Sequence, residues 1–282
     1  MLIDKVVRFW RKPLSEKRKA LGATLDYIVR GRAAREQLRF RQIIERQFVG
    51  PQALNGVAPI YTAYRPDSDV EFGMHPELRA LSGKWVADNI ESNAGDLPRL
   101  YALMLNVKQV LAESVPGDFA ELGVYRGNSA AVLAHYARAH GRQLYLFDTF
   151  EGFDGRDLTG ADLDKQRSFT ETSLDRVQRA VGTDNVHWIK GYFPASIPTD
   201  IGNTRFSIVH LDCDLYEPMK AGLLFFFPRL SPGGLLIIHD YTNPHWEGTK
   251  QAVDEFMAGI PERLVVLPDK AGTAMVRKFL GA

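Results

Sequence analysis

The chain has 282 residues, of which 45% are hydrophobic and 24% charged, with a formal net charge of +1. This balance is that of a globular protein and excludes a disordered or fibrous chain. Cys213 is the only cysteine, so an internal disulfide is excluded and a reducing, cytoplasmic setting is expected. The apolar run Leu223 to Phe227 is too short for a membrane span, and the first residues lack the apolar core of a secretory signal.

The positive charge is concentrated in the first 50 residues, which carry 13 Lys and Arg against 5 Asp and Glu. Between Met1 and Lys12, apolar residues recur at helical spacing with basic residues among them, which predicts a basic amphipathic helix. Such a helix can lie on an anionic membrane or touch nucleic acid. Packing on its own domain or on a second subunit is the favoured interpretation, and it predicts a homo-oligomer.

Much of the region before Pro116 is predicted to be helical. Residues 15–29 and 33–48 contain few helix breakers, and a loop rich in Gly and Pro follows them. Residues 76–111 again show apolar positions at periods of three and four. We therefore predict a helical, basic N-terminal extension at residues 1–70 and a main domain at residues 71–282.

After Pro116, short apolar runs alternate with amphipathic helices, as in parallel sheets built from βαβ units. Strands are predicted at residues 118–122, 143–147, 186–189, 206–211, 235–238, 264–267 and 274–279, and helices at residues 129–140, 173–181, 219–230 and 246–257. Only a short turn, residues 268–272, joins the last two strands, so they must be antiparallel neighbours. Five parallel strands plus a C-terminal antiparallel hairpin indicate an α/β, Rossmann-like sheet of the class I methyltransferase type rather than the dehydrogenase type.

A glycine loop joins the first predicted strand to a helix. Its spacing is G-x-x-x-G, from Gly123 to Gly127, and it lacks the glycine that admits a pyrophosphate in dinucleotide enzymes. Gly123 permits a tight turn and close approach of a ligand, and Gly127 lets the helix pack close to the sheet. Glu121 would repel a phosphate but can accept hydrogen bonds from the ammonium group of a methionine-like ligand. The loop residues expected at this cofactor site are Glu121, Gly123, Val124, Tyr125, Gly127 and Ser129.

A second acid follows the next strand. Asp148 stands 21 residues beyond Gly127, where an open α/β sheet places the carboxylate that accepts ribose hydroxyls. Alternatively, it caps the following turn. Gly191, after the third strand, is expected beside the adenine on topology alone.

Acids and a histidine follow the fourth and fifth strands. Asp212 and Asp214 can point into one pocket while Cys213 faces the packed side, because strand side chains alternate. Together with His239 and Asp240 they lie at the carboxyl ends of strands, where ligands bind. Converging carboxylates suit Mg²⁺ or another small divalent ion, although acids at strand ends also cap turns. His239 is open to three roles: metal ligand, general base or hydrogen-bonded bystander.

At these residues the chain resembles the macrocin O-methyltransferase family, whose members methylate sugar hydroxyls of antibiotics with S-adenosylmethionine. The resemblance rests on four segments: residues 117–127, 146–152, 210–216 and 232–241. It implies that Asp212 and Asp240 hold Mg²⁺ and that Asp214 takes the hydroxyl proton. The position of Asp212 at a strand end also places it beside the cofactor. Where the family usually shows two consecutive aspartates, this chain has His239 and Asp240. Imidazole is a poor ligand for Mg²⁺, so the metal is expected to bind weakly, to be Mn²⁺-like, or to be replaced by His239 as base.

The leading hypothesis is thus an S-adenosylmethionine-dependent O-methyltransferase acting on a sugar hydroxyl of a glycoside, polysaccharide or glycolipid. Methyl transfer to a phenolic or other small-molecule hydroxyl is a second interpretation, and a non-catalytic cofactor-binding partner is a third. Nucleic acid is not an expected ligand of the catalytic half, because its acidic cluster would repel a phosphate backbone.

Overall fold

The structure is a computed structural model that describes residues 75–77, 80–81, 85, 96–165 and 168–280. These residues belong to one compact unit that begins at Tyr64. The predictions for the N-terminal extension, including its basic helix and its boundary at residue 70, lie outside the described residues. None of the helices in the described part of the chain combines the length and apolar character that crossing a bilayer requires.

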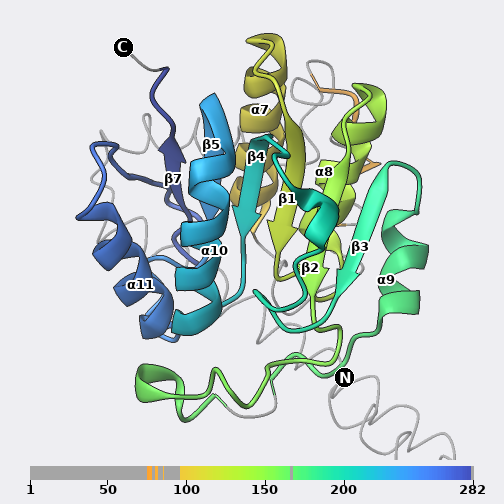
Figure 1. The fold of residues 1–282 in the computed structure, drawn as a ribbon. Helices are drawn as coiled ribbons and strands as arrows, with labels where there is room; N and C mark the ends of the chain where they lie inside the picture. Colours follow the sequence, from red (N-terminus) through yellow and green to blue (C-terminus); the bar gives the residue numbers. More distant parts are fainter. Residues whose placement is uncertain (1–74, 78–79, 82–84, 86–95, 166–167, 281–282) are drawn as a thin grey trace, which may run out of the picture. The chain divides into compact units, whose positions relative to one another are not determined.

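Parallel strands and helices alternate through most of the domain, as predicted (Figure 1). The strands are β1 (Asp118–Leu122), β2 (Leu144–Asp148), β3 (Val186–Lys190), β4 (Phe206–Leu211), β5 (Leu230–Ile238), β6 (Val265–Val266) and β7 (Ala274–Arg277). The helices are α7 (Leu97–Ala112), α8 (Asn128–Ala139), α9 (Leu174–Val181), α10 (Tyr216–Arg229) and α11 (Glu247–Met257). Two short 3-10 helices were not predicted, η1 (Gly160–Asp162) and η2 (Thr199–Ile201).

The described strands form one seven-stranded sheet in the order β3-β2-β1-β4-β5-β7-β6. The first five strands are parallel, and β7 pairs antiparallel with both β5 and β6, which confirms the predicted hairpin. The chain runs outward from β1 to β3 and then returns to place β4 on the other side of β1. This reversal of direction opens a crevice at the carboxyl ends of β1 and β4, where open α/β sheets bind ligands.

Two hydrophobic layers hold the helices against the sheet. Leu100, Leu133 and Val177 bring α7, α8 and α9 onto one face. Met219 and Val253 bring α10 and α11 onto the other. Because both faces are covered, the central strands are apolar on both sides, which explains why they read as continuous apolar runs rather than as alternating ones.

Two element boundaries differ from the prediction by three residues or more. Helix α10 begins at Tyr216 rather than at Met219, since Pro218 falls in the first turn, where a missing N–H costs no helical hydrogen bond. Strand β5 begins at Leu230 rather than at Leu235, because Leu230 already pairs with Phe206 before an irregularity in the ladder. Both changes lengthen the elements that lead into and out of the crevice.

The connection between β2 and α9, residues 149–173, is docked on the domain by a buried carboxylate. Asp162 in η1 is fully buried, and its Oδ2 accepts the backbone N–H of Tyr216, the first residue of α10, at 2.7 Å. The same oxygen lies against α11, where a Cβ on Gly248 would stand 2.3 Å from it. One side chain therefore ties this connection to the N-terminal ends of two helices, where a carboxylate is electrostatically favoured.

Replacing Asp162 by Ala should release this connection. The Tyr216 N–H loses its partner, so the free energy of unfolding should fall by about 1–3 kcal/mol, and amide exchange in residues 149–165 should accelerate. Asp164→Ala is the matched control, because the Asp164 side chain is 75% exposed. Denaturant unfolding and hydrogen-exchange mass spectrometry measure both effects. Equal protection of the segment in the two variants would contradict the docking role.

Candidate active site

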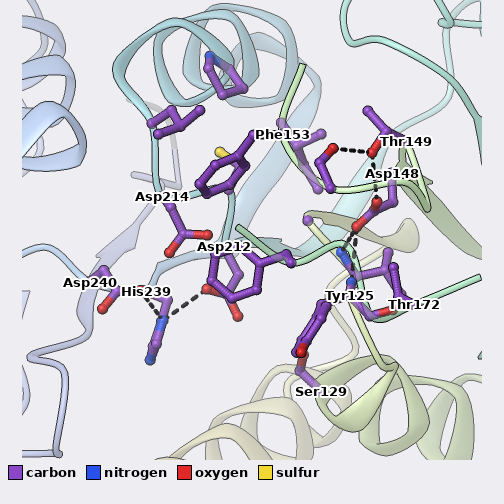
Figure 2. A pocket seen from close by; sticks show the side chains of 18 of the residues that line it. Tyr125, Ser129, Asp148, Thr149, Phe153, Thr172, Asp212, Asp214, His239 and Asp240 are labelled. Atoms are coloured by element: carbon purple, nitrogen blue, oxygen red, sulfur yellow. Dashed lines mark hydrogen bonds and ion pairs between the residues drawn. The ribbon is translucent and has the colours of Figure 1, made fainter. Parts of the chain in front are cut away.

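A cavity of about 530 Å³ lies at the carboxyl ends of the central strands (Figure 2). Its walls come from the loops after β1, β2, β3, β4 and β5 and from the connection between β2 and α9. The sequence-predicted residues that line it are Gly123, Val124, Tyr125, Ser129, Asp148, Gly191, Asp212, Asp214, His239 and Asp240. Residues remote in the chain thus converge on one site, as their places at strand ends predicted.

The glycine loop is packed directly on the end of β4. Gly123 has φ +86°, and a Cβ at this position would lie 2.0 Å from the carbonyl oxygen of Asp212. Any other residue would collide with backbone, so the close approach requires glycine. The Asp212 N–H donates to the Leu122 carbonyl at 2.9 Å, which locks the two strand ends together.

Asp148 organises the same loop from β2. Its Oδ2 accepts the backbone N–H groups of Val124 and Tyr125 at 2.6 and 2.9 Å, and its Oδ1 accepts that of Phe150 at 2.6 Å. The predicted ribose-binding acid therefore also acts as the anchor of the glycine loop, which sequence reasoning did not foresee. These three bonds use both acceptor sites of Oδ2 and one of Oδ1, so one Oδ1 site is left for a ligand in the cavity.

Two predicted cofactor residues, Glu121 and Gly127, are not among the cavity-lining residues. Glu121 is fully buried, and its Oε1 lies 2.7 Å from Nδ1 of His210, its neighbour across the β1–β4 ladder. The structure therefore gives Glu121 a partner within the sheet. Gly127 begins α8 with φ +85°, and a Cβ there would meet Val177 and Val181, each at 2.8 Å. It permits close packing of α8 on α9, not on the sheet as predicted.

Asp212 and Asp214 line the cavity together, but strand alternation is not the reason. Strand β4 ends at Leu211, and Asp214 has φ +61° in the following turn. Cys213 belongs to the hydrophobic layer under α10 and also lines the cavity, so its expected separation from the pocket was wrong in part. The turn after the strand brings the two acids to one wall.

His239 faces two of the acids, as Figure 2 shows. Its Nδ1 lies 2.8 Å from Oδ1 of Asp212 and 2.6 Å from Oδ2 of Asp240. Both ring nitrogens are nevertheless buried without a hydrogen bond of good geometry, because neither carboxylate oxygen lies where a ring hydrogen points. One donor atom from each of Asp212, His239 and Asp240 lies within 4.8 Å of the others, an arrangement that can hold a metal ion.

Sequence reasoning missed Arg99, which completes this cluster from α7. Its Nη2 lies 2.5 Å from Oδ2 of Asp212, and its guanidinium carbon stands 5.4 Å from the centre of the Trp85 ring. Arg99 is buried and lines the cavity. A buried carboxylate needs a cation or a proton, but the sequence does not indicate which basic residue supplies the charge.

The charges in the cluster shift one another's pKa values. Burial disfavours ionised Asp212, but His239 and Arg99 hold its pKa well below the ordinary value. Burial, reinforced by Asp240 and Asp212, raises the pKa of Asp214 well above the ordinary value, so this carboxyl favours its protonated form and is a strong proton acceptor once ionised. Burial and Arg99 lower the pKa of His239, whereas Asp212 and Asp240 raise it, and the result is a pKa of about 9.

Four aromatic side chains form a cluster that lines the cavity, and sequence reasoning identified only one of them, Tyr125. The Phe153 ring lies 5.1 Å from the Phe169 ring and 5.7 Å from the Trp246 ring, measured between centroids. Tyr125 from the glycine loop touches the same group, 4.9 Å from Phe169. All four residues line the cavity. They provide an apolar surface on which a ring-shaped acceptor can pack.

Comparison with known proteins agrees with this geometry. Residues 69–270, more than half of the chain, match the macrocin O-methyltransferase (TylF) family. The 8-demethyl-8-(2,3-dimethoxy-alpha-L-rhamnosyl)-tetracenomycin-C 4'-O-methyltransferase of Streptomyces olivaceus is 36% identical over 201 residues, which is 65% of this chain and 73% of that relative. The demethyldecarbamoylnovobiocin O-methyltransferase of Streptomyces niveus is 30% identical over 196 residues, 64% of this chain and 73% of that relative.

The fold agrees as well. The solved structure of the O-methyltransferase NovP superposes with a TM-score of 0.58 at 28% identity, over 65% of this chain and 80% of that one. The predicted family and sheet type are thereby confirmed. The chain belongs to the macrocin O-methyltransferase family and is an S-adenosylmethionine-dependent O-methyltransferase.

Proposed function

We propose that the protein transfers the methyl group of S-adenosylmethionine to a sugar hydroxyl of a small-molecule glycoside, assisted by a divalent metal ion. The observation that carries this proposal is the single cavity that joins the Gly123 loop and Asp148 to Asp212, Asp214, His239 and Asp240. One side of it offers a place for a methyl donor, and the other offers groups that can activate a hydroxyl.

The donor side consists of Asp148 and the loop that it orders. When bound, S-adenosylmethionine supplies a methyl group on a positively charged sulfur. Asp148 would accept a ribose hydroxyl at the Oδ1 site that the three backbone N–H groups leave free. The Gly123 turn would let the rest of the donor lie against backbone, next to the wall that carries Asp212.

On the acceptor side, three side chains have atoms that can coordinate a divalent ion. Asp212 and Asp240 offer carboxylate oxygens, and His239 offers a buried nitrogen that has no other hydrogen-bond partner. A divalent ion held by these three residues would lower the pKa of an acceptor hydroxyl and orient it. Asp214, on the same wall of the cavity, would take the hydroxyl proton as general base.

A sugar is the favoured acceptor. The Streptomyces olivaceus relative is named for methylation at the 4' oxygen of a rhamnosyl tetracenomycin. In this chain, Phe153, Phe169 and Trp246 line the cavity and offer apolar faces on which a sugar ring can pack. The same faces would also accommodate a phenol, so a phenolic hydroxyl is the second candidate. A methyl-transfer screen over glycosides and phenols, with turnover confined to one class, decides between them.

Replacing Asp148 by Asn should weaken binding of S-adenosylmethionine by at least about tenfold. The amide loses the negative charge that strengthens each hydrogen bond, and its NH₂ group cannot accept the loop N–H groups. Asp184→Asn, at an exposed loop position, is the control and should bind like the unmodified protein. Titration calorimetry measures both affinities, and circular dichroism checks the fold. Unchanged binding by Asp148→Asn would refute the assignment of the donor side.

Removing divalent ions should abolish methyl transfer, because without a metal ion the acceptor hydroxyl is too weak an acid. Adding the ions back should restore activity. In the restored enzyme, Asp214→Asn should lower turnover by about 10²–10⁴-fold while metal binding persists. Methyl-transfer assays after exhaustive EDTA treatment, with elemental analysis of the protein, test both statements.

The alternative is His239 as the general base without a metal ion. In that case activity survives chelation, and His239→Ala becomes the most damaging variant. Full turnover in protein shown to be free of metal would overturn the metal-assisted mechanism and leave the methyltransferase assignment intact.

A further inference from the structure

The metal-binding group includes a nitrogen atom at its centre. Nδ1 of His239 lies within 2.8 Å of one oxygen from Asp212 and within 2.6 Å of one oxygen from Asp240. The side chain is almost completely buried, and its two ring nitrogens have no hydrogen bond of good geometry. A metal ion bound between the two carboxylates would give this buried nitrogen a partner.

The second oxygen of each carboxylate is occupied by a different donor. Arg99 holds Oδ2 of Asp212 at 2.5 Å, and the side-chain amide of Asn243 donates to Oδ1 of Asp240 at 2.6 Å. Each acid is thus turned so that its remaining oxygen faces His239. Outer partners of this kind fix the orientation of metal ligands. The site therefore offers a metal ion one oxygen from each aspartate and one nitrogen from His239.

This donor set is poorly matched to Mg²⁺. Magnesium prefers oxygen ligands, and its attraction to a site depends mainly on negative charge. Here the Arg99 guanidinium cancels part of the charge of Asp212, and the third ligand is an imidazole rather than a carboxylate. Ions of the first transition series gain more from a bond to imidazole nitrogen, in the order Mn²⁺, Fe²⁺, Co²⁺.

We propose that Asp212, His239 and Asp240 select a first-row transition-metal ion over Mg²⁺, and that His239 is the residue that sets this selectivity. The inference rests on the proposed metal-assisted methyl transfer and specifies which ion serves it. The competing interpretation is that His239 is a permanent cation held by two carboxylates, in which case the three residues bind no metal ion.

Metal titration of the full chain tests the proposal. Protein without a polyhistidine tag is freed of metal and titrated separately with Mg²⁺, Mn²⁺ and Co²⁺ by calorimetry. We expect Co²⁺ to bind at least about tenfold more tightly than Mg²⁺, with Mn²⁺ between them. His239→Asp should strengthen Mg²⁺ binding and weaken Co²⁺ binding. The ratio of the Co²⁺ affinity to the Mg²⁺ affinity should therefore fall at least about tenfold. His140→Asp makes the same chemical change at an exposed position after α8 and should leave the ratio unaltered.

A spectroscopic measurement on the unmodified protein does not depend on the folding of any variant. Pulsed electron paramagnetic resonance of bound Mn²⁺ should show modulation from a coordinated imidazole nitrogen, and His239→Asp should remove it. Absence of nitrogen modulation in the unmodified protein, or an affinity ratio that His239→Asp leaves unchanged, would overturn the proposal. If no ion binds, the inference and the metal-assisted step both fail. Binding of S-adenosylmethionine and methyl transfer in EDTA then show whether the methyltransferase assignment itself stands.

Discussion

The close contact between the Gly123 turn and the backbone of Asp212 is the constraint on which the site depends. Because a Cβ at residue 123 would lie 2.0 Å from the Asp212 carbonyl oxygen, the ends of β1 and β4 approach as closely as two backbones can. That approach sets the glycine loop directly beside the acid cluster. Methyl transfer requires donor and acceptor atoms held within contact distance, so the packing of two strand ends serves the chemistry.

Asp212 carries the second organising interaction, because it belongs to both halves of the cavity. Its backbone packs against the Gly123 turn, while its carboxylate lies between Arg99 and His239. Arg99 comes from the first turn of α7, a helix that packs on one face of the sheet. The helix that precedes the sheet thus provides, together with His239, a positive charge that stabilises the ionised form of this partly buried acid.

The sheet and much of the site were predictable because both follow from local patterns. Apolar runs located the strands, and acids at strand ends identified Asp148, Asp212 and Asp240, since parallel strands direct their carboxyl ends to one edge. What the sequence could not supply were contacts between remote segments. Nothing distinguishes Arg99 from other basic residues before folding, nor the buried Asp162 from the exposed Asp164 two positions later. The pairing of Glu121 with His210 was not foreseen either, because His210 stands across a strand ladder.

The histidine at position 239 is best understood through the charge of its surroundings. An aspartate at position 239 would be a fourth carboxylate beside Asp212, Asp214 and Asp240 in the cavity. Arg99 pairs with only one of them, Asp212. Mutual repulsion would then favour protonation of one acid and compete with its role as ligand or base. His239 adds no negative charge, so it does not further raise the pKa of Asp214, which burial, Asp240 and Asp212 already hold above the ordinary value. Arg99 and His239 therefore both limit the negative charge of the pocket, and Asp212, His239 and Asp240 still offer three atoms that can hold a metal ion.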